Sequence, residues 1–195
     1  MTKNAIMADV DSNCSIQIRK ILVPIDGSKC SLNAAKYAVK LAKDENAQLF
    51  CIHVIGGLPY GYEGAPPHII DQYFNDLEEK AQSWFKEVKD MARSENVTEL
   101  KTEIFMDVKS IIESIIDYAT SKDIDLIVIG TRGRTGLKRF LTGSVANGVV
   151  QHAHCSVMII REKLLVRYVS SYSIWDDASC RCEAFYCISL GFIGI

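Results

Sequence analysis

The sequence contains no apolar run that reaches the roughly 20 residues needed to cross a bilayer. Its first residues, MTKNAIMADVDSNCSIQIRK, also have no sustained apolar region of the kind that marks a secretory signal. Charge of one sign is lacking too, because 22 basic and 24 acidic side chains nearly cancel. We therefore expect no membrane span, no secretion, and no general binding to nucleic acid or to anionic membranes.

Cysteine is present but follows no pattern. The seven cysteines are odd in number and have no disulfide-framework spacing. Cys51 lies within an apolar, strand-like run, where a small buried thiol is the simplest interpretation. Together with the missing signal, these thiols predict a reducing, cytoplasmic environment.

Apolar segments alternate with amphipathic ones along most of the chain, whose 48% hydrophobic content is enough for one full core. The segments with strand character are residues 21–25, 48–55, 100–106, 126–129 and 156–160. Between them, apolar residues at helical spacing occupy residues 32–46, 70–88, 110–121 and a stretch from about 144. This alternation predicts an α/β fold with a five-stranded, parallel, doubly wound sheet and helices on both faces. The third strand alternates in polarity, which is typical of a sheet edge.

Three regions of the chain differ in character. Residues 1–18 have neither periodicity nor turn chemistry, and we expect a flexible lead-in there. Residues 19–161 hold the whole strand–helix alternation and are predicted to form one domain. Residues 162–195 form an atypical extension that could pack on the domain, bind a partner, be disordered, or be a non-native addition. The sequence leaves these alternatives open.

Widely spaced glycines mark the stretch IGTRGRTGLKRFLTGSVANGV. Gly130 directly follows the fourth predicted strand, Gly133 comes three residues later, and Gly143 precedes a predicted helix start. Glycines let backbone N–H groups approach a bulky anion, and a helix start adds unpaired N–H donors, here those of Ser144 and Val145. Four cations make the loop basic: Arg132, Arg134, Lys138 and Arg139. The pattern favours a polyphosphate ligand.

Asp26 follows the first predicted strand and would share a rim with Gly130 if their strands are neighbours, because ligands bind beyond the carboxyl ends of such strands. Two plainer interpretations remain open. The Asp-Gly-Ser sequence at this point could be a turn with a helix cap, and the loop cations could be a solvated surface. We expect Gly130→Val or Gly143→Val to block a nucleotide by placing a branched side chain where the phosphates approach.

The glycine spacing matches neither the P-loop nor the dinucleotide-binding fingerprint. Its form, G-x2-G-x9-G-[ST], resembles the signature of the ATP-binding branch of the universal stress protein family. Four segments carry the resemblance in the family's order: ILVPIDGS, CIHVI, DLIVIGTRGRTGLKRFLTGSV and CSVMIIR. The resemblance covers residues 19–161.

This resemblance implies a sheet ordered 3-2-1-4-5 and a bound ATP with its Mg²⁺. Pro24, Ile25 and Asp26 would line the nucleoside end, with Asp26 near the ribose or a phosphate-bound metal. Val54 would meet adenine through its main chain. The residues expected around the ribose and phosphates are Ile129, Gly130, Gly133, Gly143, Ser144 and Val145. Arg132, one of the loop cations, is also expected to bind the nucleotide.

The resemblance also implies an assembly. Family members commonly pair as homodimers through the last strand, here Ser156–Ile160. The extension leaves that strand directly, so it could block the pairing.

Three functions remain open on these grounds. The first is a regulatory module that binds ATP in a stress response. The second is a slow ATPase or another nucleotide-dependent enzyme that uses the same site. Against it, the sequence shows a phosphate clamp but no convincing base, and His53 is expected to be a hydrogen-bonded core or rim residue rather than a catalyst. The third is an interaction module that binds no nucleotide.

Overall fold

Strands and helices alternate through the part of the chain that the computed structural model describes, namely residues 17–106, 110–131, 143–161 and 187–188. The strands are β1 (Lys20–Pro24), β2 (Gln48–Ile55), β3 (Leu100–Met106), β4 (Leu126–Gly130), β5 (Ser156–Ile160) and β6 (Cys187–Ile188). The helices are α1 (Lys29–Glu45), α2 (Pro67–Ser94), α3 (Ile111–Ser121) and α4 (Ser144–His152). The predicted alternation is confirmed.

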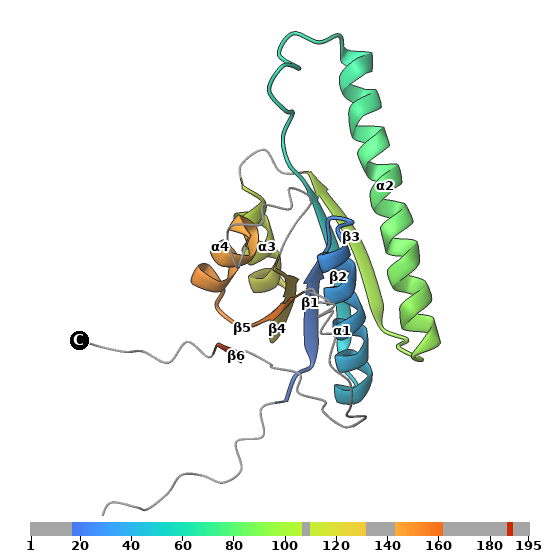
Figure 1. Ribbon diagram of the computed structural model, residues 1–195, viewed down its shortest axis with the longest axis vertical. Coiled ribbons are helices and arrows are strands. Elements are labelled where there is room, and N and C mark those ends of the chain that lie inside the picture. Colours follow the sequence, from blue (N-terminus) through green and yellow to red (C-terminus); the bar gives the residue numbers. More distant parts are fainter. Residues whose placement is uncertain (1–16, 107–109, 132–142, 162–186, 189–195) are drawn as a thin grey trace, which may run out of the picture.

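β1 to β5 form a parallel sheet in the order β3-β2-β1-β4-β5, which runs through the middle of the molecule in Figure 1. The predicted α/β fold and strand order are therefore confirmed. β1 and β4 are neighbours, with Leu22 of β1 opposite Ile127 of β4. The chain builds the sheet outward from β1 in both directions, first through β2 and later through β4. Such a switch point is where open sheets of this kind bind their ligands.

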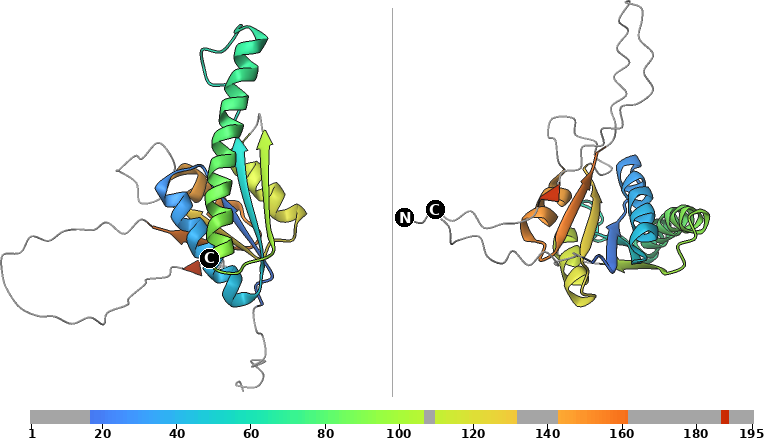
Figure 2. Two further views of the ribbon diagram at one scale, coloured as in Figure 1. Left: turned by 90° about the vertical axis from the view of Figure 1, so that its right-hand side faces the viewer. Right: turned by 90° about the horizontal axis from the view of Figure 1, so that it is seen from below.

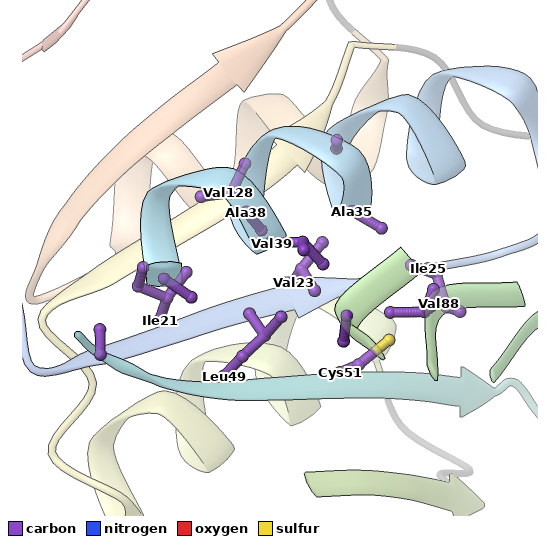
Figure 3. Packing of buried hydrophobic residues seen from close by; sticks show 14 of the residues in the cluster. Ile21, Val23, Ile25, Ala35, Ala38, Val39, Leu49, Cys51, Val88 and Val128 are labelled. Carbon is purple, nitrogen blue, oxygen red and sulfur yellow. The ribbon is translucent and has the colours of Figure 1, made fainter. Parts of the chain in front are cut away.

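Helices cover both faces of the sheet, with α1 and α2 on one face and α3 and α4 on the other (Figures 1 and 2). Side chains of β1 alternate between the two faces. Ile21 and Val23 pack with α1 (Figure 3), whereas Leu22 belongs to the core under α3 and α4. Because both faces of the strand are buried, its sequence is an unbroken apolar run. The small Ala35 and Ala38 on the inner face of α1 let this helix lie close to the sheet.

The carboxyl-terminal part of α2 is the part that packs on the sheet. Its buried side chains are Ala81, Phe85, Val88 and Ala92. The amino-terminal part rises beyond the carboxyl ends of the strands (Figures 1 and 2). Apolar residues keep their helical spacing there, but Tyr73 and Leu77 belong to neither core cluster. Within the described ranges, no helix is both long and apolar enough to cross a membrane.

β3 lies at one edge of the sheet, as its alternating sequence predicts. Leu100 and Ile104 pack against the core, whereas Met106 at the end of the strand is 56% exposed. In the neighbouring β2, Cys51 is fully buried, and burial raises the pKa of its thiol. The interpretation of Cys51 as a small buried side chain is confirmed.

At the other edge, β6 adds a short antiparallel strand to β5. Ile188 lies opposite Val157, and Cys187 lies opposite Met158. The sequence does not predict this strand, because two residues are too few to display a period. β6 comes from the extension, and it occupies part of the edge that the family resemblance assigns to a homodimer.

Candidate functional site

A pocket of about 390 Å³ opens beyond the carboxyl ends of β1, β2 and β4. Pro24 and Asp26 line it from the end of β1, Val54 from β2, and Gly130 from β4. Because β1 and β4 are neighbours, Asp26 and Gly130 lie at one rim, as the sequence predicts. The pocket therefore occupies the switch point of the sheet.

Asp26 is held by the turn between β1 and α1. Its Oδ1 accepts the backbone N–H of Ser28 at 3.0 Å, and its own N–H donates to Ser31 Oγ at 3.2 Å. Ser28 is the N-cap of α1, because its Oγ accepts the Ser31 N–H at 3.1 Å. Gly27 has φ +76°, in the region that favours glycine, and its Cα faces the Trp84 indole. The turn and the helix cap are thus present, and the same turn places Asp26 at the pocket.

Gly130 is required by the packing of β4 against α1. A Cβ at this position would lie 2.7 Å from the carbonyl carbon of Cys30 and 2.8 Å from its oxygen. Real Cβ atoms do not come this close to backbone, so a side chain would force the strand and the helix apart. Valine at this position would disturb the packing of β4 on α1, so a loss of nucleotide binding in Gly130→Val would not by itself identify a phosphate contact.

The first turn of α4 supplies hydrogen-bond donors at the pocket. Gly143 is the N-cap, with φ −69° and ψ 162°, and its N–H donates to the Thr131 carbonyl at 2.6 Å. The helical hydrogen bonds start with Asn147, whose N–H donates to the Gly143 carbonyl at 2.9 Å. The N–H groups of Ser144 and Val145 precede that point, so they have no acceptor within the helix. Both residues line the pocket, where the positive end of the helix dipole favours an anion.

Gly143 does not need the conformational freedom of glycine, because its dihedral angles are open to any residue. Among the described glycines near the pocket, the physical cause that favours glycine therefore differs from one position to the next. At Gly130 the cause is close packing, and at Gly27 it is a positive φ.

Apolar side chains line the pocket on the β2 side. They come from β2, α2 and α3: Val54, Tyr73, Leu77, Ile111 and Ile115. Sequence reasoning missed the α2 and α3 members, because their helical spacing is the same as that of ordinary core residues. A signal was available for α2, since its apolar stripe continues for longer than the sheet can cover.

His53 also lines the pocket, and it is only 6% exposed. Its Nδ1 lies 2.7 Å from the Ile25 carbonyl oxygen, which joins β2 to the end of β1. The ring also meets Trp84 edge-to-face, with centroids 5.2 Å apart. The prediction of a hydrogen-bonded core or rim histidine is confirmed.

The pocket gathers the predicted site residues that the structure describes: Pro24, Ile25, Asp26, Val54, Ile129, Gly130, Gly143, Ser144 and Val145. Arg132 and Gly133 lie outside the described residues, as do the cations Arg134, Lys138 and Arg139. Among the described residues, no group of three or more His, Cys, Asp or Glu side chains is placed to hold a metal ion. The described lining of the pocket therefore combines an apolar side, N–H donors at a helix start, and the Asp26 carboxylate.

Similar proteins are known for most of this chain. The universal stress protein family matches residues 17–161. A universal stress protein from Methanocaldococcus jannaschii is 39% identical over 145 residues, which cover 74% of this chain and 82% of that protein.

Solved structures share the fold. The universal stress protein UspA from Lactobacillus plantarum superposes with a TM-score of 0.65 at 28% identity, over 74% of this chain and 99% of that one. A universal stress protein from Archaeoglobus fulgidus, solved in complex with dAMP, has a TM-score of 0.54 at 22% identity, over 74% of this chain and 98% of that one. At the latter identity, the likeness is one of fold alone.

Proposed function

Because the chain belongs to the universal stress protein family, we propose that its pocket binds an adenine nucleotide, ATP with Mg²⁺, as a regulatory module in a stress response. One observation carries the proposal. The first turn of α4, the Asp26 carboxylate and an apolar wall all face the same pocket of about 390 Å³. A nucleotide needs these three environments, for its phosphates, its ribose or metal, and its base.

Each part of the ligand has a proposed place. The N–H groups of Ser144 and Val145 receive the phosphates, and Asp26 meets the ribose or the bound metal. The main chain of Val54 meets the adenine beside the apolar wall. Mg²⁺ commonly binds through one or two carboxylates together with phosphate oxygens and waters. Asp26, the carboxylate among the described residues that line the pocket, therefore fits a metal that arrives with the nucleotide.

The dAMP bound by the Archaeoglobus fulgidus protein supports an adenine ligand for this fold. A cytoplasmic location is a further proposal. Among the described residues, Cys51 and Cys155 form no disulfide, as expected in a reducing compartment.

A thermal melt with and without millimolar Mg·ATP tests the proposal, with GTP as the comparison. A ligand at about 100 times its Kd adds roughly 2.7 kcal/mol to the free energy of unfolding. For a chain of this size, the melting temperature should then rise by about 5–10 °C. A rise with ATP but not GTP is expected. No rise, in protein shown to carry no nucleotide through purification, would favour an interaction module. Rapid ADP release that Asp26→Ala abolishes would favour an enzyme.

Ser144→Pro separates phosphate binding from folding. Ser144 is the first residue of α4, where proline is tolerated, and the ψ of 162° at Gly143 suits a residue that precedes proline. The variant removes both the N–H and the hydroxyl, so we expect an unchanged melting temperature without ligand and roughly 10- to 100-fold weaker ATP binding. Ser144→Ala keeps the N–H and should retain most of the affinity. Equal binding by Ser144→Pro and wild type would contradict the phosphate site.

A further inference from the structure

The part of α2 that rises beyond the sheet has a side that faces the pocket. Tyr73 and Leu77 line the pocket, although the buried contacts of α2 begin further along the helix at Ala81. Figures 1 and 2 show this part of α2 standing above the strand ends, joined to β2 by the segment that precedes the helix. The amino-terminal part of α2 therefore forms one wall of the pocket.

Tyr73 is held in place by other aromatic rings. Tyr62, from the segment that joins β2 to α2, packs against it with ring centroids 5.0 Å apart and planes tilted by 47°. Phe74 meets it edge-on at 5.4 Å. Tyr73 itself is half-buried. A ring fixed in this way is a preorganised surface, because little side-chain freedom is lost when a ligand packs against it.

The position of Tyr73 assigns it to one part of the ligand. In the sheet, β1 separates β2 from β4, and the N–H donors of Ser144 lie on the β4 side. Tyr73 belongs to α2, which packs against β2 and β3, and it lines the pocket together with Val54 of β2 and Ile115 of α3. If the phosphates bind at the start of α4, the base of the nucleotide occupies the apolar side of the pocket.

We propose that Tyr73 stacks on the base of the bound nucleotide, and that Tyr62 positions its ring. This inference rests on the proposed function and adds a residue outside the glycine loop and the strand ends. An aromatic face attracts any planar base, so Tyr73 strengthens the binding of the nucleoside part and leaves the choice between purines to main-chain contacts.

Calorimetric titration of three ligands tests the role of Tyr73. Mg·ATP carries both parts of the ligand, adenosine carries the base without phosphates, and tripolyphosphate carries phosphates without the base. Tyr73→Leu is expected to weaken ATP and adenosine by roughly 5- to 100-fold and to leave tripolyphosphate within about twofold of wild type. Tyr73→Phe keeps the ring and should bind as wild type does. Tyr60→Leu is the matched control, because Tyr60 is 95% exposed and does not line the pocket.

The outcomes separate this inference from the function on which it rests. If wild type binds ATP and Tyr73→Leu binds it equally well, the stacking role is wrong and the proposed function stands. Equal losses for ATP and tripolyphosphate would also overturn it, because they would indicate a change in pocket shape. A loss in Tyr73→Phe as large as in Tyr73→Leu would assign the effect to the hydroxyl and would overturn stacking. If wild type binds neither ATP nor adenosine, both proposals fail.

Discussion

Gly130 and Gly56 both lie at the carboxyl end of a strand beside the pocket, but the space around them differs. A Cβ on Gly130 would come within 2.7 Å of the Cys30 backbone, whereas on Gly56 its nearest neighbour would be Ile111 Cδ1 at 3.8 Å. Gly130→Ala is therefore expected to lower the free energy of unfolding by about 1–3 kcal/mol through overpacking. Gly56→Ala should change it by less than about 0.5 kcal/mol. Urea unfolding without nucleotide measures both values.

The two alanine variants also decide between two explanations for a glycine at position 130. If Gly130→Ala is as stable as Gly56→Ala and loses only nucleotide binding, phosphate access is the reason, as the sequence suggests. Sequence alone finds the position because the glycine spacing is visible. It cannot tell which neighbour approaches, since α1 lies about 100 residues earlier in the chain.

At the scale of the element, the residues at the start of α1 both cap the helix and hold Asp26 at the pocket. Ser28 caps the helix through its Oγ, whereas Asp26 is held by the Ser28 backbone N–H and by Ser31 Oγ. Ser28→Ala removes the cap and keeps both contacts of Asp26. We expect about 1 kcal/mol lower stability with ATP affinity changed less than about threefold. Urea unfolding and ATP titration measure the two effects.

Ser28→Thr is the matched control for the cap, because threonine retains a hydroxyl at the same position. It should stay within about 0.5 kcal/mol of wild type. Full stability in Ser28→Ala would contradict the capping role. Loss of ATP binding in Ser28→Ala would make the hydroxyl itself part of the ligand site.

The helices show what periodicity can and cannot predict. Spacing identifies α1 and its inner face, including Ala35 and Ala38, because a helix that packs along its whole length repeats one pattern. In α2 the same pattern continues through Tyr73, which belongs to neither core cluster. Periodicity records which face is apolar but not what covers that face. Spacing alone therefore does not predict the pocket wall formed by α2; the available signal is the length of the apolar stripe, which exceeds what the strands can cover.

For the whole molecule, the strand–helix alternation predicts a parallel doubly wound sheet, but it leaves the order of the strands open. The order β3-β2-β1-β4-β5 is implied by the family resemblance. It meets the condition, neighbouring β1 and β4, under which the sequence predicts that Asp26 and Gly130 share a rim. The sequence pattern does not predict β6, in contrast to the other five strands. Its pairing depends on the edge that β5 offers rather than on a pattern in its own two residues.

That edge determines the assembly we expect. The family resemblance predicts a homodimer through β5, where exposed backbone groups can pair with a second copy. In this chain β6 already pairs with β5 at Val157 and Met158. Because β6 is part of the same chain as β5, its effective concentration at this edge does not depend on the protein concentration. Its pairing therefore competes with dimerisation at every protein concentration. We therefore expect the full chain to be a monomer and a variant that ends at Arg161 to form a dimer.

Light scattering coupled to size exclusion, run at several concentrations, measures the two masses. The shortened variant should approach twice the monomer mass and should lose mass on dilution, whereas the full chain should not change. Ile188→Pro in the full chain is the control, because proline removes a backbone N–H and disfavours strand pairing while the extension keeps its length. It should dimerise as the shortened variant does, since the freed edge of β5 is the same in both. A dimeric full chain, or a shortened variant that stays monomeric at the highest concentration, would show that β6 does not control this edge.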